Sequence, residues 1–229
     1  MWCKLRFKVI FVRDMETLDY IQAEPKIGEG IFLTTDVSQI LGLPYSKVRR
    51  WMKEYWPEYT FGDTGNQAVN FKTLIEFYTF FHLRDKGLSV SKIEKYHQII
   101  ADELDTSYPF ARSIRTDGKH VWYERLGNLI KADQKKQFDI KPILEPFLHK
   151  IDFGDGEIAQ RFFPLKNTKD IVVDPQRQFG QPIVNGTSIK AETLYNLYKG
   201  GEKTKHIAEL YDLNVSQVKH AIEYFRNVA

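Results

Sequence analysis

The sequence predicts a mainly α-helical protein with small β-hairpins. We expect an N-terminal winged helix-turn-helix domain and a C-terminal domain that combines a β-hairpin with a second helix-turn-helix. Two stretches, 34–55 and 204–226, each contain two helical segments separated by a short break. Apolar residues recur at helical spacing over most of 71–104. Glycine-containing turns between short apolar runs indicate hairpins near 59–71 and 171–189.

The length and composition are those of a two-domain protein. A chain of 229 residues, 42% of them hydrophobic, can form two modest cores, because domains commonly span about 100–150 residues. We expect an N-terminal strand or tail at 1–28, the first helix-turn-helix domain at 29–106, a middle segment or linker at 107–160, and the second helix-turn-helix domain at 161–229. The net charge of +3 permits a nucleic-acid partner but also suits many enzymes.

Cysteine content and hydropathy restrict the location of the protein. The single cysteine, Cys3, excludes a disulfide within one chain and a zinc site built on several cysteines. This usage suits a reducing, cytoplasmic environment. No apolar run approaches the ~20 residues that a membrane-spanning helix needs, so we expect no membrane partner.

The first pair of helices is predicted from the sequence TTDVSQILGLPYSKVRRWMKEY, which begins at Thr34. The break falls at Gly42-Leu43-Pro44, and Pro44 fits the first turn of the second helix because it has no N–H to lose there. Four side chains of the second helix, spaced i, i+3, i+4 and i+7, predict a buried stripe: Val48, Trp51, Met52 and Tyr55.

A hairpin and two further amphipathic helices are expected next. Gly62 and Gly65 lie between apolar flanks in 59–71, where a winged helix-turn-helix has its β-wing. Gly87 is expected to end the first of the two helices, and Ser89 to cap the second. The first helix has the stripe Leu74, Phe77, Tyr78 and Phe81. The second has the stripe Val90, Ile93, His97, Ile100 and Leu104.

The middle of the chain is less regular. We expect a turn at Thr116-Asp117-Gly118, a helix at 143–151, and a plain turn at Asp152-Phe153-Gly154. The last tripeptide also occurs in protein kinases, but no glycine-rich phosphate loop or catalytic loop accompanies it here.

The C-terminal part predicts a hairpin, one helix and the second helix pair. Asn185-Gly186 between short apolar runs is typical of a type I′ turn, which needs positive φ angles. A helix is expected over 191–199, ended by Gly200-Gly201. The second helix pair is expected in TKHIAELYDLNVSQVKHAIEYF. Asn214 and Gln217 resemble a capping box at the start of its second helix.

The outward faces of the two helix pairs supply the candidate DNA contacts. A helix-turn-helix places its second helix in the major groove, while basic groups beside it grip phosphates. Arg49 and Arg50 can reach guanine or phosphate, and Lys47 and Lys53 are expected phosphate contacts. The full candidate set is Thr35, Ser46, Lys47, Arg49, Arg50, Lys53, Asn66, Lys219 and His220. An ordinary helical hairpin with a solvated basic face is the alternative for the first pair, and a structural or dimerising role for the second.

The order of elements in the first domain resembles the DNA-binding domain of the MerR family over about 75 residues. The resemblance is carried by FLTTDVSQILGLPYSKVRRWMKEY, by a wing ending at Val69-Asn70-Phe71, and by LRDKGLSVSKI. It implies operator binding by a winged helix-turn-helix. Two departures are Asn70, where that family usually has arginine, and the lack of a long dimerising coiled coil after the domain.

The last 60 residues or so resemble a small antitoxin domain that was long catalogued only as of unknown function, and whose members are encoded beside PIN-like toxins. The resemblance is carried by Asp174-Pro175, Gly180-Gln181-Pro182 and Gly186-Thr187, followed by a helix and a helix pair. Ser188 stands where that family usually has arginine. Joined to a MerR-like domain, the chain is similar to the longer VapB-type antitoxins.

The sequence shows no catalytic motif, and we expect no enzyme activity, cofactor or metal. The six histidines have no ligand-like spacing, and no nucleophile motif, phosphate loop or dinucleotide fingerprint is present. Asp152, Asp155 and Glu157 could bind a cation, but a polar turn is the simpler interpretation.

Our hypothesis is an antitoxin of a type II toxin–antitoxin system. It would neutralise a PIN-like ribonuclease toxin and repress its own operon by binding double-stranded operator DNA as a homodimer or higher oligomer. Lys166, Lys169 or Arg177 are candidate contacts to the carboxylates of the toxin. One alternative is a MerR-like, effector-sensing regulator with a pocket built from Trp122, Tyr123 and Phe138. Another is an assembly protein that uses both helix pairs for protein contacts.

Overall fold

The computed structural model describes residues 26–63, 65–112, 115–116, 119–120, 125, 128, 130, 148–154 and 158–226. The expected N-terminal strand or tail at 1–28 therefore lies almost wholly outside the described residues. Trp122, Tyr123 and Phe138, which the sequence suggested as the lining of an effector pocket, also lie outside them.

The described part of the chain is mainly helical with small antiparallel β pairs, as the sequence predicted. Its α-helices are α1 (Thr34–Leu41), α2 (Tyr45–Glu54), α3 (Phe71–Asp85), α4 (Val90–Leu104), α7 (Ala191–Lys199), α8 (Thr204–Leu210) and α9 (Val215–Arg226). The strands pair as β1 (Phe32–Leu33) with β2 (Ala68–Val69), β3 (Arg115–Thr116) with β4 (Lys119–His120), β5 (Ile151–Phe153) with β6 (Ala159–Phe162), and β7 (Ile171–Val172) with β8 (Ile183–Val184). Short 3₁₀ turns at Pro57–Tyr59 and Gln178–Gly180 complete the described elements.

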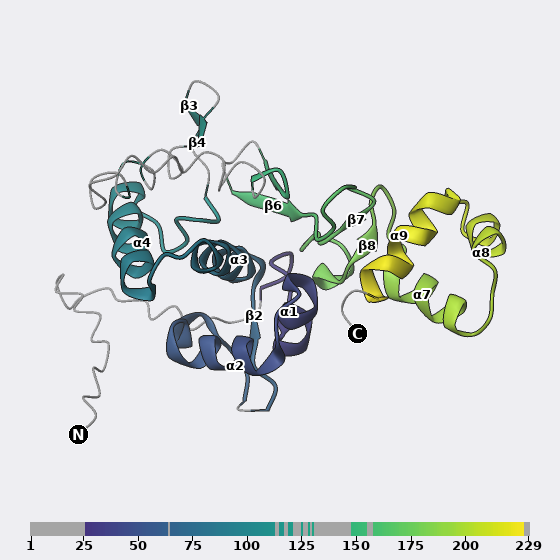
Figure 1. Ribbon diagram of the computed structural model, residues 1–229, viewed down its shortest axis with the longest axis horizontal. Coiled ribbons are helices and arrows are strands. Elements are labelled where there is room, and N and C mark those ends of the chain that lie inside the picture. Colours follow the sequence, from purple (N-terminus) through teal and green to yellow (C-terminus); the bar gives the residue numbers. More distant parts are fainter. Residues whose placement is uncertain are drawn as a thin grey trace.

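The described part of the chain is elongated (Figure 1). Among its residues are two large hydrophobic cores and a small third cluster, Phe163, Val172 and Ile183. α3 lies in the middle of the larger part, with α1 and α2 on one side and α4 next to it (Figure 1). α7, α8 and α9 form the other end, and β7 and β8 lie between the two parts (Figure 1). The segment 107–160 contributes buried residues to the first core, namely Phe110, Ala111, Ile130, Ile151 and Ala159.

The expectation of a single apolar stripe on α3 is wrong, because this helix is buried on almost every side. Trp51 of α2 packs edge-on against Phe80 with 5.1 Å between ring centroids. On another side, Tyr78 contacts Phe162 of β6 at 4.7 Å. A helix that is enclosed by neighbours on several faces has apolar residues all round it. Picking out one stripe at helical spacing does not reveal that the other faces are buried too.

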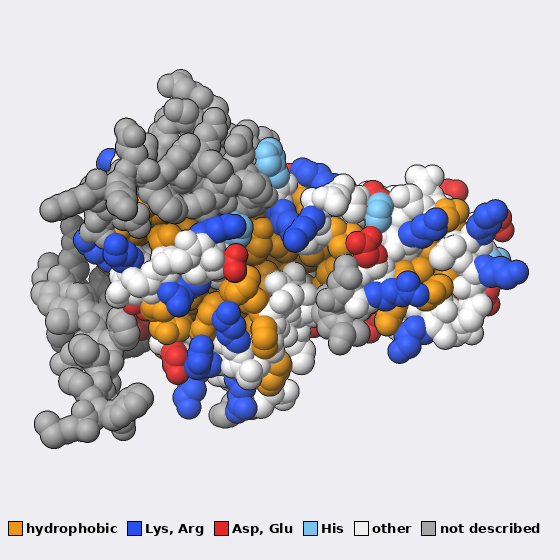
Figure 2. Space-filling view, viewed as in Figure 1, with side chains coloured by type: hydrophobic (Ala, Val, Ile, Leu, Met, Phe, Trp, Pro, Cys, Tyr) orange, Lys and Arg blue, Asp and Glu red, His pale blue; other side chains and the backbone are white. Residues whose placement is uncertain are grey.

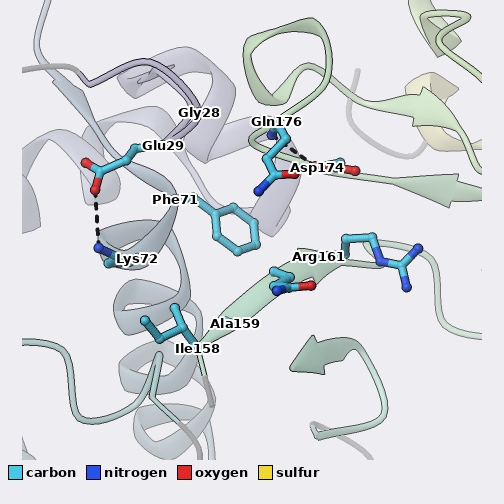
Figure 3. A pocket seen from close by; sticks show the side chains of 10 residues that line it. Gly28, Glu29, Phe71, Lys72, Ile158, Ala159, Arg161, Asp174 and Gln176 are labelled. Atoms are coloured by element: carbon cyan, nitrogen blue, oxygen red, sulfur yellow. Dashed lines mark hydrogen bonds and ion pairs between the residues drawn. The ribbon is translucent and has the colours of Figure 1, made fainter. Parts of the chain in front are cut away.

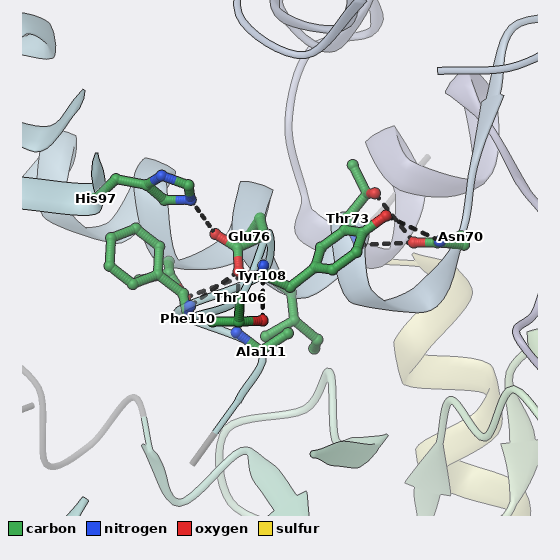
Figure 4. Close-up of polar contacts among 10 residues, drawn as sticks. Asn70, Thr73, Glu76, His97, Thr106, Tyr108, Phe110 and Ala111 are labelled. Carbon is green, nitrogen blue, oxygen red and sulfur yellow. Dashed lines mark hydrogen bonds and ion pairs between the residues drawn. The ribbon is translucent and has the colours of Figure 1, made fainter. Parts of the chain in front are cut away.

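Buried polar side chains of α3 fix the backbone that surrounds it (Figure 4). Glu76, 1% exposed, accepts hydrogen bonds from the backbone N–H groups of Phe110 and Ala111 at 2.9 and 3.0 Å. Its other carboxylate oxygen lies 2.9 Å from His97 Nε2 on α4. A buried carboxylate is tolerated when its oxygens are hydrogen-bonded in this way. Glu76 therefore ties α3, α4 and the chain after α4 together.

The predicted hairpin at 59–71 forms only in part. Phe61 and Ala68 exchange backbone hydrogen bonds of 3.0 and 2.9 Å as an isolated bridge. Tyr59 belongs to the 3₁₀ turn at Pro57–Tyr59, and Phe71 is already the first residue of α3. The main partner of β2 is β1, from before the first helix pair, which the sequence did not reveal because two-residue strands leave almost no alternating pattern.

The C-terminal end of the middle segment differs from the expectation in two places. Leu148 is helical, as expected for a helix at 143–151, but this helix ends before Ile151, which begins β5; residues 143–147 lie outside the described residues. Asp152 and Phe153, expected in a turn, belong to the same strand, which pairs with β6. The β3–β4 hairpin fits the turn expected at Thr116–Gly118, although Asp117 and Gly118 themselves lie outside the described residues.

The C-terminal elements fall where the sequence placed them, apart from the type of one turn. Gly186 has a φ of +83°, but the φ of Asn185 is not positive. A type I′ turn needs positive φ at both positions, so this turn is of another type. Val184 N–H instead donates to Ile189 across this turn, while β8 pairs with β7. Half of the expected capping box is present, because Asn214 N–H donates to Gln217 Oε1 at 2.9 Å.

The ring of Phe32 joins the two parts of the molecule. It is fully buried, and a Cβ atom on Gly180 would lie 2.3 Å from it, closer than any side chain can approach. A Cβ atom on Gly30 would lie 2.6 Å from the same ring. Next to it, Ile31 N–H donates to the Phe179 carbonyl at 3.1 Å. β1 is thus packed against the loop that precedes β8.

Candidate nucleic-acid interface

The first helix pair, α1 and α2, is joined by a tight turn. Gly42 adopts a left-handed conformation with a φ of 63°, which glycine reaches without a Cβ clash. Leu43 N–H donates to the Ser38 carbonyl at 2.9 Å, and Ser38 Oγ donates to the Leu43 carbonyl. Pro44 precedes the first residue of α2, as its missing N–H predicts.

The inner face of α2 packs on an aromatic cluster. Val48, Trp51 and Met52 are buried, and Tyr55 is partly buried, which confirms the predicted stripe. Trp51, 5% exposed, contacts Phe80 and Phe81 of α3. Thr34 of α1 hydrogen-bonds to Met52 Sδ at 3.3 Å and so links the two helices directly. The inner face of α2 is therefore packed against α3 and linked to α1.

The outer face of α2 is basic and exposed, and lysines and arginines gather over this helix in Figure 2. Ser46, Arg49, Arg50 and Lys53 are all exposed. Arg49 has no hydrogen bond or ion pair with any other described residue, and Arg50 has only a 3.8 Å contact with Glu54, in which both side chains are more than half exposed. A contact of that kind contributes little and leaves the guanidinium available to a ligand.

Lys47 differs from the other basic residues of α2. Its Nζ lies 5.0 Å from the centroid of the Trp51 ring and 4.7 Å from that of Phe81, so its position over the aromatic cluster is fixed by cation–π contacts. Thr35 at the start of α1 is exposed. Asn66 is exposed as well, in the loop between Phe61 and β2. Both lie in the same part of the fold as α2.

The second helix pair, α8 and α9, has a different surface. Lys219 is exposed, but His220 Nδ1 lies 2.6 Å from Asp170 Oδ2 and is only 28% exposed. His220 thus contacts the segment before β7. Exposed lysines also occur at the end of α7 and before and within α8, namely Lys199, Lys203 and Lys205. These lysines flank glycines and a helix start, so the outward face of α9 does not include them.

A cavity of about 380 Å³ lies beside α3, between the segment before β1 and the strand β6 (Figure 3). Its charged residues already have partners. Lys72 Nζ is 3.2 Å from Glu29, Arg161 is 2.9 Å from Asp152, and Asp174 is 3.6 Å from Arg177. No unpaired charge therefore faces this space from the described lining residues.

Within the described ranges, no three histidine, cysteine, aspartate or glutamate side chains lie close enough together to hold a metal ion. Asp152, one of three residues considered for a cation site, instead pairs with Arg161 and Lys169 at 2.9 and 3.0 Å. Asp155 and Glu157 lie outside the described residues. None of the helices described here combines the length and apolar character needed to span a bilayer.

Comparison with known proteins identifies similarity to an antitoxin, at low identity. Residues 171–225 match the model of a family described as proteins of unknown function, DUF433. The chain is 23% identical over 174 residues to VapB45 of Mycobacterium tuberculosis strain H37Rv, named as a candidate antitoxin, covering 70% of this chain and 73% of that protein. It is 22% identical over 216 residues to the uncharacterised protein Rv2308 of the same strain, covering 85% and 89%.

The crystal structure of Rv2018 from Mycobacterium tuberculosis has a similar fold. It aligns with a TM-score of 0.68 at 20% identity and covers 83% of this chain and 96% of that one. At this identity the likeness concerns the fold alone.

Proposed function

We propose that this chain is the antitoxin of a toxin–antitoxin pair, that it represses its own operon through α2, and that its C-terminal part takes part in silencing a PIN-like ribonuclease. The antitoxin assignment is supported by the similarity to VapB45 and by the DUF433 match over 171–225. The DNA-binding assignment rests on one observation above all. α2 is packed against aromatic rings on one side and carries Arg49, Arg50 and Lys53 exposed on the other.

This arrangement suits a major groove for physical reasons. Arginine binds guanine O6 and N7 in a bidentate manner, and either arginine or lysine can neutralise phosphates. α2 has a single acidic residue, Glu54, at its C-terminal end, so repulsion from phosphates is small. As a homodimer, the protein would present two such helices to a pseudo-palindromic operator. Ser46, Lys47, Thr35 and Asn66 are proposed as flanking contacts, and Lys219 and His220 as weaker ones.

The toxin contact is proposed for exposed cations of the C-terminal part. Of the three residues considered, Lys169 pairs with Asp152 and Arg177 with Asp174. Lys166 is exposed and has no ion pair with a described residue, so it is the best placed to meet a carboxylate cluster. Co-expression with the neighbouring gene followed by pull-down tests this part. Recovery of the chain alone would contradict it.

The DNA-binding part is tested by the double variant Arg49→Ala/Arg50→Ala. Binding to the chain's own upstream DNA is measured at two salt concentrations, with melting temperature as the control for folding. We expect the affinity to fall about 100-fold and the salt slope to decrease by about 2, because two phosphate or base contacts are removed. The melting temperature should stay within a few degrees, since neither arginine is buried.

A matched control removes the same charge elsewhere. Lys203 and Lys205 are exposed before and within α8, which belongs to the other core. Lys203→Ala/Lys205→Ala should retain most of the affinity. If both double variants weaken binding equally, the effect is one of net charge, and α2 is not the reading helix.

The effector-sensing alternative has less support in the described residues. A ligand pocket is usually apolar with a few convergent polar groups that orient the ligand. The cavity in Figure 3 instead has its charges in ion pairs within the protein.

A further inference from the structure

A second, smaller cavity of about 130 Å³ lies where the two parts of the molecule meet. Asp36, in the first turn of α1, lines it from one side. Glu192 in the first turn of α7 and Tyr224 on α9 line it from the other. The walls of this junction cavity thus come from both parts of the fold.

The lining of the junction cavity is acidic and has no counter-charge. Neither Asp36 nor Glu192 forms an ion pair with a described basic residue, and no lysine, arginine or histidine lines the space. Asp36 accepts a hydrogen bond from Leu33 N–H at 2.9 Å and one from the Gln181 side chain. Burial raises the pKa of Asp36, and the nearby charge of Glu192 raises it further. Two carboxylates in this position attract a cation.

The hydroxyl of Tyr224 independently indicates a ligand. Tyr224 is 2% exposed, and its hydroxyl has no hydrogen-bond partner among the described residues. Buried polar groups without a partner are rare because they have lost their water and gained nothing in return. The charge of Asp36 acts on this hydroxyl and contributes to raising the pKa of Tyr224, after burial, so the two groups face the same small space. A ligand with N–H groups would satisfy both.

We infer that the junction cavity binds a small organic cation, a guanidinium or primary ammonium group on an alkyl stem. The carboxylates of Asp36 and Glu192 accept its N–H donors, and the Tyr224 hydroxyl accepts a further one. Ile40, Pro182 and Phe225 line the same space and offer apolar contact to the stem. A divalent metal is a poorer fit, because no three histidine, cysteine, aspartate or glutamate side chains come together in the described part of the chain and apolar residues line part of the space. The volume admits a group of a few heavy atoms.

Calorimetric titration of the full chain tests this site, with butylguanidine and butylamine as the cationic probes and butylurea as the neutral isostere of butylguanidine. Ionic strength is kept constant with potassium chloride. We expect at least one cationic probe to bind with a dissociation constant of about 1 mM or lower, and butylurea to bind at least about tenfold more weakly. The inference does not depend on the proposed function, because the readout involves neither DNA nor a toxin.

Three variants locate the site. Glu192→Gln and Asp36→Asn should each weaken binding about tenfold, and Tyr224→Phe about threefold, since charged hydrogen bonds are stronger than neutral ones. Glu192 is exposed, so its variant remains informative even if Asp36→Asn, which alters a capping contact of α1, fails to fold. Glu209→Gln, an exposed carboxylate on α8, is the matched control and should bind as the unmodified chain does.

Any of the following outcomes would overturn the inference. The first is absence of binding up to about 10 mM probe, which corresponds to no useful affinity. The second is equal binding of butylurea and butylguanidine, since the cation would then be irrelevant. The third is an affinity that Glu192→Gln leaves unchanged, or displacement of the probe by magnesium ions, which would assign the cavity to a metal.

Discussion

The two helix pairs share a layout but differ in what lies behind the second helix and what projects from it. Trp51 of α2 packs on Phe80 and Phe81 of α3, and the outer face of α2 presents arginines to solvent. α9 packs on α7 and α8 through small aliphatic residues and one partly buried aromatic pair, Phe225 on Tyr195, and its His220 is bound to Asp170. Similar backbone elements therefore present different surfaces. Side-chain chemistry on the outer face, more than the helix pair itself, is the reason we propose the first pair, and not the second, as the DNA reader.

The largest expected difference between the two pairs is in stability. Trp51→Ala should destabilise the protein by about 3–5 kcal/mol, because a large buried side chain leaves a cavity that its neighbours cannot fill. Phe225→Ala on α9 should cost about 1–3 kcal/mol, since Phe225 is only partly buried and stacks on Tyr195. Denaturant unfolding followed by circular dichroism measures both. Equal losses would mean that the aromatic backing does not distinguish the pairs.

Alkaline pH should weaken both cores through their buried tyrosines. Burial raises the pKa of Tyr59 to about 12, and burial also raises those of Tyr78 and Tyr224. These phenols stay protonated in the folded chain, whereas in the unfolded chain they ionise near pH 10. The unfolded state thus binds fewer protons, and the free energy of unfolding falls as pH rises from about 10 to about 12.

The measurement is tyrosinate absorbance recorded together with the helical circular dichroism signal. Absorbance from the buried tyrosines should appear in step with the loss of helix. Tyr59→Phe and Tyr224→Phe should each move this transition to higher pH, one acting in the first core and the other in the second. A transition that neither variant moves would show that other groups control alkaline unfolding.

The smallest expected effect is that of His220→Ala, which tests whether His220 stabilises the fold or contacts DNA. His220→Ala should lower the free energy of unfolding by about 1 kcal/mol, because the hydrogen bond to Asp170 is lost. Lys219→Ala, next to it but exposed, should change stability by less than about 0.5 kcal/mol. Operator binding is measured on the same samples. Weaker DNA binding by His220→Ala at unchanged stability would instead make this residue a DNA contact.

Local signals in the sequence were sufficient for the turn between α1 and α2 and for the start of α4. Pro44 and Gly42 mark the turn of the first pair, and Ser89 accepts a hydrogen bond from Lys92 N–H at the start of α4, as its place before an apolar run predicts. The stripe around Trp51 followed from helical spacing alone. These features depend on a few neighbouring residues, which is why they can be read without tertiary structure.

Features that depend on distant residues could not be predicted in this way. β1 and β2 are too short to show alternation, and their partners are separated by the whole first helix pair. Glu76 lies among apolar residues of α3, and only the approach of Phe110 and Ala111 explains a buried carboxylate there. Asp36 and Tyr224 lie far apart in the chain, so nothing in the sequence suggested that they would share a cavity.

The ring of Phe32 has a consequence for how the chain can be divided. It belongs to β1, yet it fills the space beside Gly180, in the region that the DUF433 model matches. A fragment that starts near residue 171 would lack Phe32, so the space beside Gly180 would be open to water. A fragment that ends before residue 171 would instead expose the Phe32 ring. The matched stretch therefore lacks one side chain that packs against it in the full chain, and we expect an excised version to gain stability if a large apolar side chain is introduced beside Gly180.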